Sequence, residues 1–442
     1  MDAETARRQL INHLPVEILG EILLWAGANH WARRGSQGPW YIGHVCGLWR
    51  SIVLALPQLW AEVWISNFGE TALSWSIRMA ELEEHFLRSA NTLLSVYIFW
   101  AEDLPLERNM LLMELVLRHC ERWRSLVIVL SSDIDGLFKL LAPAKNRLPV
   151  LEKLDLDFSW SGHVQSEVFL HAPKLVDLAY RGHGAGIQLP WNQIQICYFA
   201  GSIGDHIALQ SAQNLVSLHL NVESGRPPPG VPIALPRLRH LCCSGGTDLI
   251  NLAAPVLESL FLGVGSHLDL VSKFLARSRC PLKRLLVKED IAGDYYVGRP
   301  VTDMKSVIGM LQRTPSLEVL ILVASSWPEV PDSASDDSDA DEYPSPEPDV
   351  DSLFDALQLT GSQLDIVPNL STFVYGLPYD PIVWNSFMAM ARSRSFASAR
   401  FLGSWDLSDV FVEQNVKEIK REELRMLVTT NFPETWIKPG RI

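Results

Sequence analysis

The chain has 442 residues, of which 48% are hydrophobic and 20% charged, which excludes a mainly disordered protein and favours two or three globular domains. Its formal net charge of -13 argues against a general nucleic-acid-binding protein, because neutralising phosphates requires a basic surface. No apolar leader opens the sequence, and no stretch approaches the roughly 20 apolar residues of a membrane span. We therefore expect an intracellular protein, cytoplasmic or nuclear, that has no membrane partner.

In chain order, the first pattern is a pair of short helices between Leu14 and Trp60. Pro15 has the fixed φ of a first helical position. The apolar residues of the first helix are Leu14, Ile18, Ile22 and Trp25, and those of the second are Val45, Trp49, Ile52, Val53 and Leu56. Pro57 should end the second helix, and Gly47 inside it costs about 1 kcal/mol relative to Ala. Residues 28–38 favour a polar linker between the two helices.

The same residues carry a family resemblance. The stretch begins Leu14-Pro15-Val16-Glu17-Ile18-Leu19 and ends with Val45-Cys46-Gly47-Leu48-Trp49-Arg50-Ser51-Ile52-Val53 and Leu56-Pro57-Gln58-Leu59-Trp60. It resembles the F-box of basidiomycete-type fungal proteins, with the pattern LPxEIL…VCxxWRxIA…PxLW. The resemblance implies docking on a Skp-family linker protein, and through it recruitment of a cullin-RING ubiquitin ligase. The implied linker contacts are Leu14, Pro15, Glu17, Ile18, Leu19, Ile22, Val45, Cys46, Trp49, Arg50, Pro57, Leu59 and Trp60.

Two helices of this size cannot bury their apolar faces alone, because a segment of about 45 residues lies near the lower limit for a stable core. A partner would complete such a module. The alternative is a helical cap on the next domain. Residues 68–89 then favour a connecting helix.

From residue 93 a second pattern recurs: one apolar residue, two variable positions, then two apolar residues separated by one. It fills about eleven units. The apolar positions of these units are Leu93/Val96/Ile98, Trp123/Leu126/Ile128, Leu151/Leu154/Leu156, Leu175/Leu178/Tyr180, Trp191/Ile194/Ile196, Leu215/Leu218/Leu220, Leu238/Leu241/Cys243, Leu257/Leu260/Leu262, Leu282/Leu285/Val287, Leu317/Leu320/Leu322 and Leu370/Phe373/Tyr375.

This L-x-x-L-x-L pattern resembles that of leucine-rich repeats, so the chain resembles an F-box protein of the leucine-rich-repeat type. The expected fold is α/β: an N-terminal helical F-box, then an irregular solenoid with a parallel β-sheet on its concave face. The Asn or Cys that usually satisfies loop backbone groups in such repeats is mostly absent. The alternative is an ordinary α/β domain with a parallel sheet. The expected domains are 10–65 F-box, 66–90 connecting helix, 91–326 solenoid, 327–352 acidic insertion, and 353–442 terminal repeats and cap.

The insertion is the one abrupt change of composition. Residues 327–351 hold ten acidic residues and five prolines, with no Lys or Arg, which is typical of a disordered segment. The first hypothesis is that this segment is a solvated loop without a specific role. Because Ser333 and Ser338 each precede an acidic residue by three positions, a phosphorylated regulatory loop is the second hypothesis.

Catalytic motifs are missing from the sequence: it has no nucleophile elbow, H-E-x-x-H or P-loop. The six cysteines lack metal-ligand spacing, and we expect no metal and no cofactor. His219 and His240 fall in neighbouring units, where a catalytic or metal-binding pair is conceivable but strand histidines are the commoner explanation. The leading hypothesis is a non-enzymatic substrate receptor of an SCF-type E3 ubiquitin ligase; the alternative is a repeat-based interaction scaffold outside any ligase.

Strand alternation predicts the surface that would bind the substrate protein. If the paired apolar residues point into the core, the residue between them points to the concave face. This predicted column is Asp155, Ala179, Gln195, His219, Cys242, Phe261, Leu286, Ile321 and Val374. Its apolar members Phe261, Leu286 and Ile321 are the candidate substrate contacts. The alternative is that other parts of the chain cover them as core.

Overall fold

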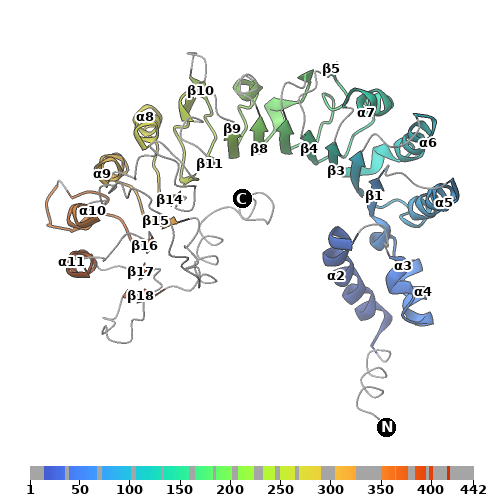
Figure 1. The fold of residues 1–442 in the computed structure, drawn as a ribbon, viewed down its shortest axis with the longest axis horizontal. Coiled ribbons are helices and arrows are strands. Elements are labelled where there is room, and N and C mark those ends of the chain that lie inside the picture. Colours follow the sequence, from blue (N-terminus) through green and yellow to red (C-terminus); the bar gives the residue numbers. More distant parts are fainter. Residues whose placement is uncertain are drawn as a thin grey trace, which may run out of the picture. The chain divides into compact units, whose positions relative to one another are not determined.

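The computed structural model describes residues 14–34, 39–66, 72–100, 106–130, 134–158, 165–182, 186–201, 208–222, 232–243, 249–263, 268–289, 304–324, 350–363, 365–376, 384–394, 398–401 and 416–418 (Figure 1). The chain divides into two compact units, Met1–Ile194 and Gln195–Ile442. This division falls inside the predicted repeat region. Within the described ranges, no helix has the length and apolar character needed to cross a membrane.

The first unit begins with helices. They are α2 (Val16–Arg34), α3 (Trp40–Gly43), α4 (Gly47–Ala55) and the 3-10 turn η1 (Pro57–Trp60). The predicted linker at residues 28–38 is wrong for its first part, because residues 28–34 contain neither Gly nor Pro and continue α2. Gly47 is the first residue of α4, where the predicted mid-helix cost does not apply; Cys46 caps the helix, its Sγ accepting the Trp49 N–H at 3.5 Å. The predicted end of this helix at Pro57 is confirmed.

The rest of the first unit is a parallel sheet with strand order β1-β2-β3-β4-β6 and helices on one side (Figure 1). The strands are β1 (Glu62–Ser66), β2 (Leu94–Trp100), β3 (Trp123–Leu130), β4 (Lys153–Phe158) and β6 (Asp177–Gly182), with a short pair β5 (Gln165–Ser166) and β7 (Gly186–Ile187). The helical segments are α5 (Ala72–Arg88), α6 (Leu106–Leu117), α7 (Ile134–Leu141), η2 (Cys120–Arg122), η3 (Ala142–Ala144) and η4 (Trp191–Gln193). The connecting helix predicted at residues 68–89 is thus found as α5.

The second unit has the same design, with parallel strand order β8-β9-β11-β13-β14-β15-β16-β17-β18. These strands are β8 (Ile196–Gly201), β9 (Ser217–Val222), β11 (His240–Cys243), β13 (Ser259–Leu262), β14 (Arg284–Glu289), β15 (Val319–Ala324), β16 (Thr372–Gly376), β17 (Ser398–Phe401) and β18 (Val416–Glu418). Helices α8 (Leu268–Ser278), α9 (Met304–Leu311), α10 (Val350–Leu357) and α11 (Trp384–Ser393) connect strands, and β10 (Ile233–Ala234) pairs with β12 (Leu252–Ala253). The predicted α/β class is confirmed.

The strand register confirms most of the predicted frame. In the first unit, Leu126 pairs with Leu154 and Leu154 with Leu178, each from the same position of the pattern. In the second unit, Leu218, Leu241, Leu260, Leu285, Leu320 and Phe373 are aligned in the same way. These side chains are at most 1% exposed, so the repeated apolar positions form the core of each unit.

The frame predicted at Trp191 is wrong. Trp191 lies in η4, and the core positions are Ile194, Cys197 and Phe199, because Cys197 pairs with Leu218 and Phe199 with Leu220. Tyr198 therefore replaces Gln195 in the predicted column.

A further unit was missed at the start of the sheet. Trp60, Val63 and Ile65 are buried at the spacing of the pattern, and Val63 pairs with Val96 in β2. In the next unit, Leu93, which was predicted as the first core position, is exposed.

Long polar side chains satisfy the loop carbonyls that an Asn or Cys usually serves. Arg122 Nε donates to the Thr92 carbonyl at 3.0 Å, and Arg277 donates to the Leu252 carbonyl at 2.7 Å. Three more hydrogen bonds of this kind join the Gln193 side chain to the Ala172 carbonyl and the Arg394 side chain to the Val367 and Ile366 carbonyls. Because buried carbonyls without partners are costly, these side chains stabilise turns for which the sequence offered no motif.

Candidate partner-binding surfaces

The N-terminal helices form a small module around a core of their own. Its buried residues are Leu19, Leu23, Ile42, Ile52, Val53, Leu59 and Trp60. Two side-chain hydrogen bonds hold the helices together: Trp60 Nε1 donates to the Val53 carbonyl at 2.9 Å, and Arg50 Nε donates to the Gly43 carbonyl at 3.0 Å. We call residues 14–60 the helical module.

Helix α5 packs against this module through Trp60. The Trp60 ring meets Trp40 edge-on at 4.8 Å between centroids and His85 at 5.2 Å, and the Arg88 guanidinium lies 5.4 Å from the Trp60 centroid. Burial lowers the pKa of His85 to about 4, although backbone hydrogen bonds at Glu62 and Trp60 act in the opposite direction. His85 is therefore a neutral part of the junction between the helical module and β1.

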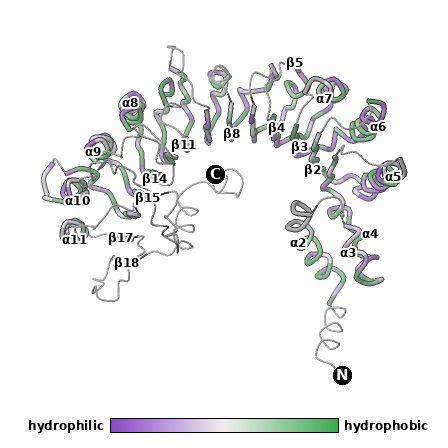
Figure 2. Tube along the Cα trace, viewed as in Figure 1, coloured by the Kyte–Doolittle hydropathy of each residue, from purple (hydrophilic) through white to green (hydrophobic). Residues whose placement is uncertain are grey.

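The helical module also carries large apolar side chains that are exposed. Helix α2 turns Leu19 and Leu23 inward, while Ile18, Ile22 and Trp25 lie on another side of the helix. The exposed apolar side chains are Val16 (53%), Ile18 (48%), Ile22 (40%), Trp25 (79%), Tyr41 (64%) and Val45 (59%). Figure 2 shows hydrophobic residues over much of α2 and α4. We call these six residues the apolar face.

The predicted linker contacts divide between this face and the core. Ile18, Ile22 and Val45 belong to the apolar face, while Pro15, Glu17 and Arg50 are exposed beside it; Leu14, Cys46, Trp49 and Pro57 are half-buried. Direct contact is not supported for Leu19, Leu59 and Trp60, whose side chains pack in the module core. Val16, Trp25 and Tyr41 were not predicted as contacts; exposure of large apolar side chains is the signal that identifies them.

The predicted substrate contacts in the second unit are not a surface. Phe261, Leu286 and Ile321 are register neighbours, as expected, but they are 6, 2 and 0% exposed. Their neighbours Cys242 and Val374 are also buried. Exposing a row of such side chains would forfeit the free energy of apolar burial, and the structure has them in the core instead. The prediction that these three side chains are exposed substrate contacts is therefore wrong.

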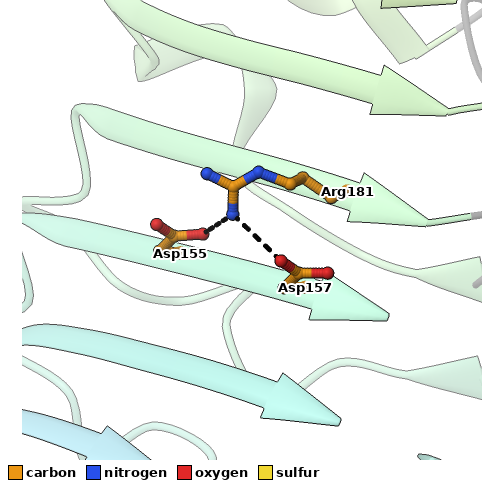
Figure 3. A network of polar contacts seen from close by, with 3 residues as sticks. All are labelled: Asp155, Asp157 and Arg181. Atoms are coloured by element: carbon orange, nitrogen blue, oxygen red, sulfur yellow. Dashed lines mark hydrogen bonds and ion pairs between the residues drawn. The ribbon is translucent and has the colours of Figure 1, made fainter. Parts of the chain in front are cut away.

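In the first unit, the strand face turned away from the helices is only half buried. Strands β2, β3 and β4 alternate buried and partly exposed residues, and the buried set packs on the helices, as Phe138 of α7 does on Phe158 of β4 at 5.9 Å. On the other face, Arg181 Nη1 donates to Asp155 at 2.8 Å and lies 3.5 Å from an Asp157 oxygen (Figure 3). Lys153 pairs with Asp177 at 3.3 Å. We call this surface the open strand face.

Aromatic rings continue the open strand face on β1 and β2. Trp64 stacks on Tyr97 with ring centroids 4.1 Å apart and planes 6° apart, and on Phe99 at 5.6 Å and 5°. Register explains the first contact, because Trp64 lies directly opposite Tyr97. The predicted column began at Asp155 and did not include these rings.

His219 and His240 lie on the neighbouring strands β9 and β11 but are not directly opposite each other. His219 aligns with Cys242 and His240 with Ser217, and His219 meets the Tyr198 ring edge-on at 4.5 Å. Burial lowers the pKa of His240. Among the described residues, no group of three or more His, Cys, Asp or Glu side chains could hold a metal ion.

The acidic insertion is largely outside the described residues, and Ser333 and Ser338 both lie there. Helix α10 begins at Val350, two residues before the predicted end of the insertion at 352. Compared with known proteins, the chain matches no family model, and the search of curated proteins gave no significant match.

Proposed function

We propose that this chain is the substrate-recognition subunit of an SCF-type E3 ubiquitin ligase. In this proposal the helical module is an F-box that docks a Skp-family linker, and the parallel strands are an irregular leucine-rich-repeat-like solenoid that binds a substrate protein. The observation that carries the proposal is the apolar face, six large side chains between 40 and 79% exposed on one small module. Several large apolar side chains left in water on one small module favour a protein interface.

Burial of the apolar face against the linker protein would contribute favourable free energy to binding. Removing apolar surface from water contributes about 25 cal/mol per Å², or roughly 1.5–3 kcal/mol for complete burial of a large aliphatic side chain. Ile18, Ile22 and Val45 are about half exposed, so covering each would contribute about half of that. The module core below would stay intact, because Leu19 and Leu23 already fill it.

The repeated register supports the solenoid part of the proposal. Successive strands pair in parallel with the same position of the pattern aligned, from Leu218 through Leu241 and Leu260 to Leu285. Each strand is therefore one stacked unit that buries its apolar residues against its neighbours. Ubiquitin transfer would be carried out by the partner subunits, and this chain would supply binding only.

The test is recovery of a Skp-family linker with the purified chain. The variant Ile18→Ser/Trp25→Ser removes two side chains of the apolar face, and the matched control Leu106→Ser/Met110→Ser makes the same kind of change on α6, where Leu106 and Met110 are 66 and 54% exposed. We expect the wild type and the control to recover the linker and the apolar-face variant to recover at least tenfold less, since two lost apolar contacts exceed 1.4 kcal/mol.

Equal recovery by all three proteins, or recovery by none, would contradict the ligase proposal and leave the alternative of a scaffold outside any ligase. Circular dichroism of each variant should match the wild type, because all four substituted side chains are exposed.

A further inference from the structure

One end of the open strand face combines stacked rings with a carboxylate. Glu62, Trp64, Tyr97 and Phe99, which we call the aromatic edge, project from β1 and β2 on the same side of the sheet. Both ring partners of Trp64 come from β2. Since β1 is the first strand in the order of this sheet, the other face of the indole is turned to an edge where no described strand pairs.

Among the described residues, no ion pair involves Glu62, although other carboxylates of this face, such as Asp155 and Asp177, are paired. Burial raises the pKa of Glu62; the pKa of Tyr97 is raised first by the burial of its own phenol and then by the charge of Glu62. Partly desolvating a carboxylate without a cation costs free energy, which a bound cation would recover.

The open strand face as a whole, Glu62 included, is acidic. Its ionisable residues on β1, β4 and β6 are Glu62, Lys153, Asp155, Asp157, Asp177 and Arg181, which are four carboxylates and two cations, a net charge of -2. A partner with positive charge complements this surface, and an acidic partner would be repelled.

We propose that the aromatic edge binds an arginine side chain on a segment of a substrate protein, with the guanidinium lying on the face of Trp64 turned away from Tyr97 and donating to the Glu62 carboxylate. Arginine fits better than lysine because its planar group can stack on an indole and donate two hydrogen bonds to a carboxylate at once. Val127 and Val129 on β3 lie next to the rings and would contact apolar residues of the same segment. The inference deepens the proposed function, since it names the class of substrate segment.

The test uses the purified full chain, without linker or ligase. The probes are three pools of fluorescein-labelled nine-residue peptides, randomised except for a central residue that is arginine, its uncharged isostere citrulline, or lysine. We expect about tenfold greater retention of the arginine pool than of the citrulline pool, because a hydrogen bond to a charged group contributes about that factor. The lysine pool should be retained more weakly than the arginine pool.

Two variants locate the site. Glu62→Gln keeps the shape of the side chain and should remove the preference for arginine, as should Trp64→Leu, which removes the stacking surface. The matched control is Glu107→Gln, a change at an exposed carboxylate of α6. Equal retention of the arginine and citrulline pools, equal retention of the lysine pool, or an unchanged preference in folded Glu62→Gln would each overturn the proposal. Failure of linker recovery would not affect these measurements, so the two proposals are tested separately.

Discussion

The buried imidazole of His85 makes the stability of the first unit depend on pH. Burial lowers its folded-state pKa from 6.5 to about 4, whereas in the unfolded chain the imidazole titrates near 6.5. Between these two values the unfolded state binds the proton and the folded state does not, so stability falls as the pH is lowered from 6.5 towards 4. The loss reaches about 2 kcal/mol at pH 5 and about 3 kcal/mol below pH 4, from 1.36 kcal/mol per pKa unit.

The measurement compares wild type with His85→Gln, which cannot titrate. Urea unfolding at pH 7 and at pH 5 is followed by pulse hydrogen exchange of peptides from β1 and α5, which separates the first unit from the second. We expect wild type to lose about 2 kcal/mol more than the variant on going from pH 7 to pH 5. His171→Gln is the control, because it removes an exposed imidazole from the same unit and should behave as wild type.

An equal loss in wild type and His85→Gln would show that His85 titrates alike in both states, and would refute its neutral role beside Trp60.

Two further predictions concern the second unit and the insertion. Ile321→Ser should destabilise the second unit by roughly 3–5 kcal/mol, because it opens a cavity and buries a hydroxyl, whereas Ile77→Ser at a half-exposed position of α5 should change stability by less than about 0.5 kcal/mol. Chemical denaturation of both variants measures this, and a loss below 1 kcal/mol for Ile321→Ser would contradict its place in the core. Deleting residues 331–349 should leave the melting temperature nearly unchanged, because acidic, proline-rich segments bury little apolar area; a large drop in calorimetry would refute the prediction of disorder.

Local patterns in the sequence determined much of the fold. Strand residues alternate between two faces, so the spacing of Leu154 and Leu156 was enough to assign both to the core. Proline lacks an N–H and restricts the residue before it, so Pro57 marked the end of α4 without any tertiary information. These predictions succeed because their physical causes act within a few residues.

Where two local solutions fit equally well, only tertiary packing decided between them. Around Ile194, the sequence allows a frame through Trp191 and another through Cys197 and Phe199, since both are apolar at the right spacing. Pairing of Cys197 with Leu218 selects the second frame. In α2, likewise, apolar residues occur on more than one side, and the module core selects Leu19 and Leu23 as the buried pair.

The candidate surfaces depended on tertiary structure most of all. Phe261 and Ile321 match the spacing of the open strand face of the first unit, yet they are buried, because alternation defines a face and not what covers it. Trp64 and Tyr97 lie 33 positions apart and meet only through the register of β1 on β2. The sequence by itself determined which residues are apolar and how they repeat; the three-dimensional arrangement decided which stay exposed, because burial depends on neighbours distant in the chain.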